Sequence, residues 1–363
     1  MKILFISAAD KDFDGRTRAL TDILKKFADV IEITGTKKED HKEHEHFRIS
    51  LQNGYYTFIK KSIIAGKTVK NVDCIFVDNR KATIPALKLY KILHPKKMYY
   101  DARELYLKNE VKGITSKIGC LFEEKMIAKA DFVICANYER KKIMEKKFTH
   151  KNDILVFENF RKLLYTKDGV KEIVEKKYGN IFEKGYTHII STAGCEIERG
   201  ADKLVKAVSN LSYPNQLFLV GCKNNNETEQ IKDFVKKNNM ENVYFIPRLN
   251  QDELKYFISK CDIGVAMYHK KNSNNLYCSS GKVYEYIYEG LPVAVTDNPP
   301  LQHLVETYPV GCANADIKIA LEKVFSNYTE LLNGVNDFRN EKIVEKKQEE
   351  FTELLKHNMI GGE

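Results

Sequence analysis

Short apolar runs alternate along the chain with longer segments in which apolar residues recur at helical spacing. Most of the runs lack strict apolar–polar alternation, which is typical of strands buried on both faces of a parallel sheet. The expected strands are Ile3–Ser7, Val30–Thr34, Val72–Val77, Lys97–Tyr100, Phe132–Cys135, Ile154–Phe157, His188–Thr192, Gln216–Val220, Val243–Ile246, Ile263–Ala266 and Val293–Thr296. The expected helices are Arg16–Phe27, Ala82–Leu93, Ser116–Ala130, Glu139–Lys147, Ala201–Asn210, Glu227–Asn238, Gln251–Lys260, Lys282–Glu289 and Ile317–Phe325. This alternation predicts an α/β fold with parallel sheets covered by helices.

The strand–helix alternation occurs twice, and a stretch rich in Lys and Glu separates the two series at residues 161–186. We therefore expect two facing Rossmann-like domains, residues 1–170 and residues 171–336. Residues 337–363 are expected to form a charged C-terminal helix, which either packs on a surface or crosses back to the first domain.

Charge is distributed unevenly along the 363 residues, whose net charge is +9. Residues 1–170 carry 35 Lys and Arg against 23 Asp and Glu, whereas residues 171–363 carry 24 against 27. A basic first half indicates contact with a polyanion or an anionic membrane, and ordinary solvated lysines are the alternative reading. Lysines accompany aromatic and aliphatic residues over Tyr55–Lys70, which resembles a basic amphipathic segment. The alternative is that its aromatic side packs on the first sheet.

Several classes of protein are disfavoured by motifs that the sequence lacks. It has neither a G-x-G-x-x-G nor a G-x-x-x-x-G-K-[ST] loop, and no G-x-S-x-G elbow or nucleic-acid-binding signature. Its apolar runs are shorter than the ~18 residues that a bilayer requires. Its eight cysteines form no C-x-x-C pair, and His41, His44 and His46 stand in a polar stretch expected to be a loop. We expect a cytoplasmic protein with reduced cysteines and no metal.

Loops that follow strands are the first candidates for ligand contacts, because open α/β sheets bind ligands at the carboxyl ends of their strands. In the first domain, Gly15 opens the first expected helix, where free backbone N–H groups favour anions. In the second domain, Gly194 follows the first strand, and Arg199 and Gly200 precede the next helix. A guanidinium beside a helix N-terminus suits a diphosphate, because its donors and the helix dipole favour the same charge. An exposed arginine near a helix cap is the alternative.

The strongest pattern lies at residues 278–293, where a Ser/Gly loop opens a helix. Lys282 and Glu285 lie on one face of that helix. Lys282 and the loop amides would hold phosphates, and Glu285 would accept hydrogen bonds from ribose hydroxyls. The alternative is a surface salt bridge. Gly221, which ends a strand, and Arg248, which precedes a helix, are further candidates.

Together these features resemble the retaining GT-B glycosyltransferases, specifically glycosyltransferase family 4. The resemblance spans most of the chain and is clearest over Gly194–Val310, which includes Arg-Gly at 199–200 and Lys-x-x-Glu-Tyr-x-x-x-Gly-x-Pro-Val at 282–293. In the first half, Tyr100–Leu105 resembles the Asp-x-His-Glu element of the family. Glu158-Asn159 is similar to the site where the family often has Asn.

The resemblance implies an enzyme that transfers a sugar from a nucleotide-sugar, UDP-sugar favoured and GDP-sugar next, with retention of configuration. The acceptor would be a hydroxyl of a glycan or lipid-linked oligosaccharide in bacterial capsule or lipopolysaccharide synthesis, and no metal or cofactor would be needed. The catalytic residues would be Arg199, Lys282 and Glu285. The donor would be bound by Gly15, Gly194, Arg199, Gly200, Gly221, Arg248, Tyr277, Ser279, Ser280, Gly281, Lys282 and Glu285. The acceptor side would comprise Gly15, Arg16, Asp101, Arg103 and Glu104.

The sequence also departs from the family pattern. Tyr277 replaces the first acidic residue of the E-x7-E element, and Cys195 stands where many members have Arg. Pro247 and Arg103 replace a common Gly and His. Two other functions therefore stay open: a nucleotide-sugar epimerase of the same architecture, and a non-catalytic nucleotide-sugar-binding or scaffold protein. The basic first domain would attach peripherally to the anionic inner face of the cytoplasmic membrane.

Overall fold

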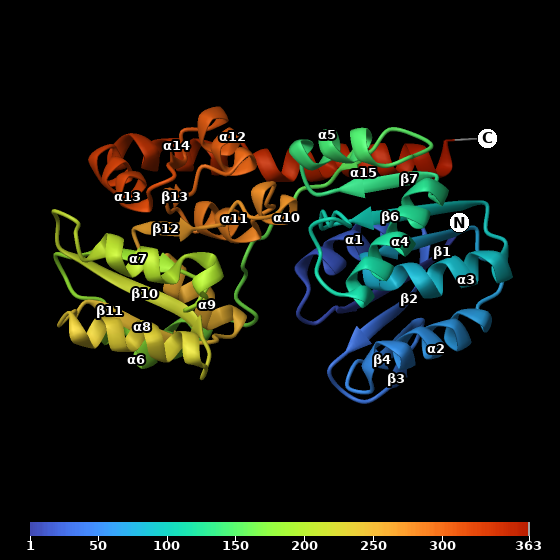
Figure 1. Cartoon of the computed structure of the whole chain (residues 1–363), viewed down its shortest axis with the longest axis horizontal. Helices are drawn as coiled ribbons and strands as arrows, with labels where there is room; N and C mark the ends of the chain where they lie inside the picture. The colour runs from blue at the N-terminus through green and yellow to red at the C-terminus, as the bar shows by residue number, and fades with distance from the viewer. Residues whose placement is uncertain (362–363) are drawn as a thin grey trace. The chain divides into compact units, whose positions relative to one another are not determined.

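The structure, a computed structural model, describes residues 1–361. Backbone contacts divide the chain into two units, which Figure 1 shows in the colours of the chain order. Unit 1 comprises Met1–Asn159 and the segment from Glu345 onward, and unit 2 comprises Phe160–Val344. The C-terminal segment thus belongs to the same unit as the N-terminus.

Unit 1 contains, within the described residues, one sheet in the order β3-β4-β2-β1-β5-β6-β7-β8. Its strands are parallel except β3, which is antiparallel to β4. The strands are β1 Lys2–Asp10, β2 Asp29–Thr36, β3 His41–Glu43, β4 His46–Ser50, β5 Cys74–Asp78, β6 Lys97–Ala102, β7 Phe132–Cys135 and β8 Leu155–Val156. The helices are α1 Gly15–Lys25, α2 Gly54–Lys67, η1 Arg80–Ala82, α3 Thr83–Leu93, α4 Ile114–Lys129, α5 Tyr138–Lys147 and α15 Ile343–Ile360.

Unit 2 contains a second sheet in the order β11-β10-β9-β12-β13-β14, with all these neighbours parallel. The strands are β9 Thr187–Ser191, β10 Asn215–Cys222, β11 Val243–Pro247, β12 Ile263–Ala266, β13 Val293–Val295 and β14 Gly311–Ala313. The helices are α6 Val170–Tyr178, η2 Gly179–Ile181, η3 Ile197–Arg199, α7 Ala201–Val208, α8 Asn226–Lys237, α9 Gln251–Ser259, α10 Ser273–Leu276, α11 Gly281–Tyr288, α12 Pro299–Thr307, α13 Ile317–Ser326 and α14 Tyr328–Asn340.

The central strands are buried on both faces, which explains their uninterrupted apolar sequences. Residues 3–6 of β1 and residues 189–190 of β9 have no exposed surface. A parallel sheet covered on both sides requires apolar residues at every position of such strands. Two Rossmann-like α/β units and a long C-terminal helix thus confirm the expected fold class.

Helix α15 packs on the sheet of unit 1 through its apolar side. The rings of Phe351 and Phe157 stack with their centroids 4.5 Å apart. The Lys97 ammonium donates a hydrogen bond of 2.8 Å to the carbonyl of Asn358. These contacts place α15 against the start of β6 and the end of β8.

Two expectations about local structure were wrong. The stretch that contains His41, His44 and His46 was expected to be a loop, but it forms β3 and β4, and the His46 ring lies 2.7 Å from the Thr34 hydroxyl. The helix expected from Asp337 is two helices, because α14 ends at Asn340 and Lys342 adopts a left-handed φ of 52°. No helix within residues 1–361 is long and apolar enough to cross a bilayer.

Candidate functional site

Two glycine turns lie side by side where β9 and β10 of unit 2 end. Gly194 and Gly221 have φ values of +63° and +99°, which side chains rarely adopt. The Gly194 N–H donates to the carbonyl of Val220 at 2.9 Å. A Cβ atom on Gly194 would lie 2.7 Å from the Gly221 carbonyl oxygen. The two backbones therefore approach each other closely at the carboxyl edge of the sheet, where the sequence predicted ligand contacts.

Arg199 lies at the end of η3, directly before the N-terminus of α7. Gly200 turns the chain with a φ of +72°, and a Cβ there would lie 2.7 Å from the Met267 methyl group. The Arg199 guanidinium sits over the Tyr268 ring, 4.5 Å from its centroid. Its Nη1 atom is buried and has no hydrogen-bond partner in the described structure. Arg199 is thus held by a ring contact and keeps a donor for a ligand.

The Ser/Gly loop leads into α11 as predicted from the sequence. Ser280 is the residue before the first helical residue, Gly281, and its buried hydroxyl has no hydrogen-bond partner in the described structure. The side chain of Asn298 fixes the preceding segment by donating to the carbonyls of Asn275 and Leu276 at 2.9 and 3.3 Å. The first backbone N–H groups of α11 have no partner within the helix and favour an anion.

Glu285 is the buried carboxylate of this site. Its side chain is 2% exposed, and its Oε1 atom lies 3.1 Å from Nε of Arg161. Burial raises the pKa of Glu285, while the positive charges of Arg161 and Lys282 act in the opposite direction. The same environment acts on Lys282, because burial and the nearby Arg199 lower its pKa to about 8.

The charges at this site do not balance. Arg161 and Arg199 both act electrostatically on Lys282, and Glu285 is the buried carboxylate beside Arg161 and Lys282. Glu196 also acts on Lys282, but its carboxylate forms an ion pair with another lysine at 2.8 Å. Desolvated like charges are costly unless an anion joins them. The site therefore favours a ligand with negative charge.

Two of the residues that shape this site were missed by the sequence reasoning. Arg161 lies in the stretch expected to separate the domains, and a single charged residue in a polar stretch gives no sequence signal. Tyr286 has no exposed surface, and its hydroxyl accepts a hydrogen bond of 2.9 Å from the N–H of Thr192. A Cβ on Gly264 would lie 2.4 Å from the Tyr286 ring, so Gly264 makes room for it.

The remaining candidate donor residues occupy different positions. Tyr277 and Ser279 lie in the loop before α11 and are partly buried. Arg248 follows β11, is exposed, and acts electrostatically on Lys223. Gly15 is the first residue of α1 and belongs to unit 1.

In unit 1, the candidate acceptor residues gather where β1, β5 and β6 end. Arg16 makes a bidentate ion pair with Asp101, with hydrogen bonds of 2.6 and 2.7 Å. Another nitrogen of Arg16 donates to the Phe157 carbonyl at 2.6 Å. Asp101 has no exposed surface. Arg16 and Asp101 thus neutralise each other's charge. The hydrogen bonds of Arg16 connect α1 with β6 and with the end of β8.

Arg103 is also engaged by carboxylates. Its guanidinium donates to Asp78 at 2.6 Å and to Asp14 at 2.7 Å. Asp14 in turn caps α1 by accepting the Thr17 N–H at 2.9 Å. The adjacent Glu104 is partly buried. In the structure, therefore, Arg103, which directly follows β6, ties the end of β5 to the start of α1 with its charge already paired.

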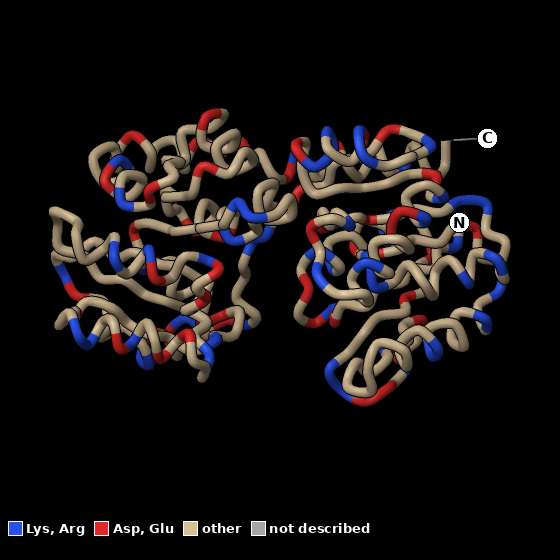
Figure 2. The backbone as a smooth tube through the Cα atoms, viewed as in Figure 1, with Lys and Arg blue, Asp and Glu red and all other residues tan. Residues whose placement is uncertain are grey.

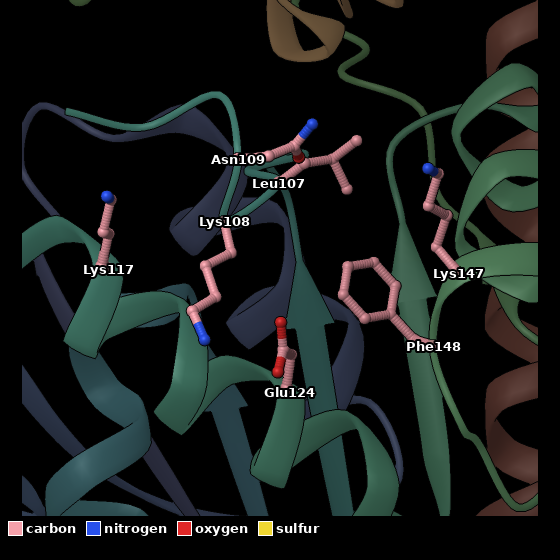
Figure 3. A pocket seen from close by; sticks show the side chains of 7 residues that line it. All are labelled: Leu107, Lys108, Asn109, Lys117, Glu124, Lys147 and Phe148. Carbon is pink, nitrogen blue, oxygen red and sulfur yellow. The ribbon is translucent and has the colours of Figure 1, made fainter.

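A separate hollow of about 440 Å³ lies in unit 1 between the loop after β6, helix α4 and the end of α5 (Figure 3). Its lining combines apolar and basic side chains: Leu107, Lys108, Asn109, Lys117, Glu124, Lys147 and Phe148. Lysines and arginines are spread over several faces of this unit (Figure 2). Among residues 1–361, no cluster of three or more His, Cys, Asp or Glu side chains suits a metal ion.

Comparison with known proteins agrees with the motifs. Residues 173–324 match the family model of the glycosyl transferases group 1. An uncharacterized glycosyltransferase of Methanocaldococcus jannaschii is 24% identical over 227 residues, or 61% of this chain. The aligned region spans 50% of that relative.

Solved structures share the fold over nearly the whole chain. Sucrose-phosphate synthase from Thermosynechococcus elongatus has a TM-score of 0.72 at 14% identity, covering 98% of this chain and 99% of that one. HepE of Anabaena, solved with UDP and glucose, has a TM-score of 0.74 at 13% identity, covering 99% of both chains.

The matched segment contains η3, which carries Arg199, and α11, which carries Lys282 and Glu285. Residues 173–324 of unit 2 thus match the group 1 glycosyltransferases, and the fold of the whole chain is that of the solved GT-B structures. The family resemblance predicted from the sequence motifs is confirmed.

Proposed function

We propose that this protein transfers a hexosyl group from a UDP-sugar to a hydroxyl group, with retention of anomeric configuration. The observation that carries the proposal is the surplus of positive charge around the buried Glu285, where Arg161, Arg199 and Lys282 meet, two of them at the N-termini of α7 and α11. A nucleoside diphosphate supplies the missing negative charge. Glu285 supplies an acceptor for the ribose hydroxyls.

The donor is a UDP-sugar in this proposal, with a GDP-sugar as the second choice. The Anabaena structure with UDP and glucose supports the choice, because that protein shares the fold over nearly its whole length. Tyr277 stands where the family has its first acidic residue, so the identity of the sugar depends on contacts that differ from the family pattern.

Arg199 and Lys282 would stabilise the departing diphosphate during the reaction. Charge develops on the leaving phosphate oxygen, and donors already oriented toward it lower the barrier because they need not reorganise. Two cations and two helix N-termini can supply this stabilisation, so the proposed reaction needs no metal. Removal of one such donor is expected to cost about 10²–10³ in rate.

The acceptor in this proposal is a hydroxyl of a glycan or a lipid-linked oligosaccharide of the bacterial cell surface. The support is the family resemblance, together with the basic character of residues 1–170. Because Arg16 and Arg103 are already paired with carboxylates, they would act by positioning the ends of β5 and β6, and an acceptor would meet other groups.

Peripheral contact with an anionic membrane is part of the proposal, and helix α4 offers a suitable face. Ile114, Ile118 and Leu121 recur at helical spacing and are 76%, 43% and 42% exposed. The exposed Lys117 and Lys125 lie on the same helix. Apolar residues flanked by lysines suit an anionic interface, where each lysine contributes about 1 kcal/mol.

Helix α2, the segment that the sequence analysis considered for membrane contact, is less suited to this role. Phe58 has no exposed surface, and the hydroxyl of Tyr55 donates to the Lys81 carbonyl at 2.8 Å. Lys61 forms an ion pair with Asp40. Part of its aromatic side thus packs on the protein, as the alternative reading expected.

Nucleotide binding tests the donor site. Purified protein is titrated calorimetrically with UDP, GDP, ADP and CMP, and compared with Glu285→Ala and the control Glu289→Ala. Glu289 lies at the end of the same helix and pairs with Lys255, away from the cation cluster. We expect the wild type and Glu289→Ala to bind UDP, and Glu285→Ala to lose this binding. Absence of binding by every nucleotide would refute the donor site, and binding without transfer to any acceptor would favour a scaffold.

Vesicle co-sedimentation tests the membrane contact. We expect more protein to pellet with anionic than with neutral vesicles, and Ile118→Asp combined with Leu121→Asp to abolish the difference. Ile173→Asp is the control, since Ile173 is also an exposed helical isoleucine but lies in unit 2. Equal pelleting with both kinds of vesicle would contradict the proposal.

A further inference from the structure

Two cysteines meet at the edge of the proposed donor site. The Sγ atoms of Cys195 and Cys222 lie 3.0 Å apart. Cys195 directly follows Gly194 in the turn after β9, and Cys222 directly follows Gly221 at the end of β10. The sequence gives no indication of this pair, because 26 residues separate the two cysteines and neither belongs to a C-x-x-C motif.

The surrounding backbone holds the two cysteines together. A backbone hydrogen bond of 2.9 Å from Gly194 to Val220 joins the two segments on one side of the pair. An ion pair of 2.8 Å between Glu196 and Lys223 joins them on the other side. The pairing of β10 with β11 shifts register between Val220 and Cys222, so the strand is irregular directly before Cys222. The close approach is therefore built into both turns.

The two thiols differ in a way that suits redox chemistry. The Cys222 thiol and the Thr228 hydroxyl are hydrogen-bonding partners of Cys195 that lower its pKa, with the positive charge of Lys232 acting in the same direction. The same interaction and burial raise the pKa of Cys222. Cys195 is 3% exposed, whereas Cys222 is half-buried. Because the thiolate is the reactive form, Cys195 is the nucleophile of the pair and Cys222 the resolving thiol.

We propose that Cys195 and Cys222 form a reversible disulfide that regulates the donor site, with a hydroperoxide as the oxidant. The Cys195 thiolate attacks one peroxide oxygen, the O–O bond breaks, and the leaving oxygen takes up a proton as water or alcohol. The Cys222 thiol then attacks the sulfur of the resulting sulfenic acid. The S–S bond forms, the S–O bond breaks, and the proton of the Cys222 thiol joins the departing hydroxide as water. The two thiols together lose the two electrons that reduce the peroxide.

The consequence for the donor rests on the function proposed above. A disulfide requires its sulfur atoms to lie about 2.05 Å apart, so the two sulfur atoms must approach by roughly 1 Å from their separation of 3.0 Å, which pulls on the turns that carry them. Gly194 and Gly221 lie in these turns, and Arg199 follows four residues after Cys195. A displacement of about 1 Å in a site that orients substrate can cost up to about a hundredfold in rate. We expect oxidation to lower kcat/KM for the nucleotide-sugar by about tenfold or more.

The test treats the full chain with hydrogen peroxide and follows two readouts. The first is mass spectrometry of peptides after blocking of free thiols, which shows whether Cys195 and Cys222 become linked. The second is sugar-nucleotide turnover before oxidation, after oxidation and after dithiothreitol. Cys195→Ser and Cys222→Ala each remove one partner. Cys312→Ser is the matched control, because Cys312 is also half-buried but lies on β14.

In the wild type, we expect oxidation to lower the number of free thiols from eight to six. Turnover should be lost on oxidation and restored by dithiothreitol. Cys312→Ser should behave in the same way, whereas Cys195→Ser and Cys222→Ala should keep the turnover that each shows before treatment. Absence of the Cys195–Cys222 link would overturn the redox pair, and equal loss of turnover in all variants would overturn its effect on the site. If the reduced protein turns over no nucleotide-sugar, the proposed function fails, and the mass measurement alone decides whether the pair exists.

Discussion

Lys282 makes nucleotide binding depend on pH in a range where few lysines titrate. Burial and the neighbouring Arg199 lower the pKa of Lys282 to about 8 in the free protein, whereas an ordinary lysine has a pKa near 10.4. A bound diphosphate stabilises the charged ammonium and raises this pKa again. Binding therefore takes up a proton once the pH exceeds about 8, and the affinity must fall as the pH rises.

The size of the effect follows from the fraction of molecules that carry the charge. With a pKa of about 8, about 0.9 of the free protein is protonated at pH 7 and about 0.24 at pH 8.5. The apparent Kd scales inversely with the competent fraction. The Kd for UDP should therefore rise about fourfold between these two pH values, which corresponds to about 0.8 kcal/mol.

Calorimetric titration with UDP at pH 7 and pH 8.5 measures this change. Lys282→Arg is the control, because the guanidinium stays charged over the whole pH range. The Kd of this variant for UDP should be the same at both pH values. The contribution of Lys282 to folding stability changes with pH in the opposite direction, so it cannot account for the weaker binding of UDP at high pH. Folding lowers the pKa of Lys282, so the unfolded chain holds more protons above pH 8, and this group makes the folded state more stable as the pH rises.

A Kd for the wild type that is equal at the two pH values would refute the reasoning. So would a fourfold rise that persists in Lys282→Arg, because another group would then be titrating. Buffers with different ionisation enthalpies add an independent check, since the proton taken up at pH 8.5 should appear in the binding heat.

Three further predictions concern residues that stabilise one unit or the other from within. Arg103→Met removes the positive charge paired with the buried Asp78 carboxylate and should lower the free energy of unfolding in urea by about 3–5 kcal/mol; an unchanged midpoint would contradict the pairing. Tyr286→Phe leaves the Thr192 N–H without its acceptor and should lower stability by about 1–3 kcal/mol and weaken UDP binding; unaltered affinity would remove Tyr286 from the positioning of the site. Phe351→Ala should cost about 3–5 kcal/mol in thermal or urea unfolding of unit 1, and a loss below 1 kcal/mol would show that α15 is weakly docked.

Local sequence patterns predicted the main elements of the fold because each of them is encoded within a few residues. The apolar runs of β1 and β9 are buried on both faces, and the sequence that leads into α11 carries its own loop and helix start. The errors arose where local pattern and tertiary contact disagree. The polar stretch from His41 forms strands because β4 pairs with β2, and the C-terminal helix is interrupted at Lys342, whose left-handed conformation no local pattern revealed.

Within the candidate site, sequence order determined which residues stand at strand ends and helix starts, and so it singled out Arg199, Lys282 and Glu285. The sequence could not determine which partners those charges would meet. Arg161 reaches Glu285 from a distant segment, and Cys195 meets Cys222 across two strands. Such pairings depend on the sheet order and on the side chains that the fold buries together. Local sequence determines neither the sheet order nor these buried neighbours. Only the tertiary structure therefore decides which groups share a site and how burial shifts their pKa values.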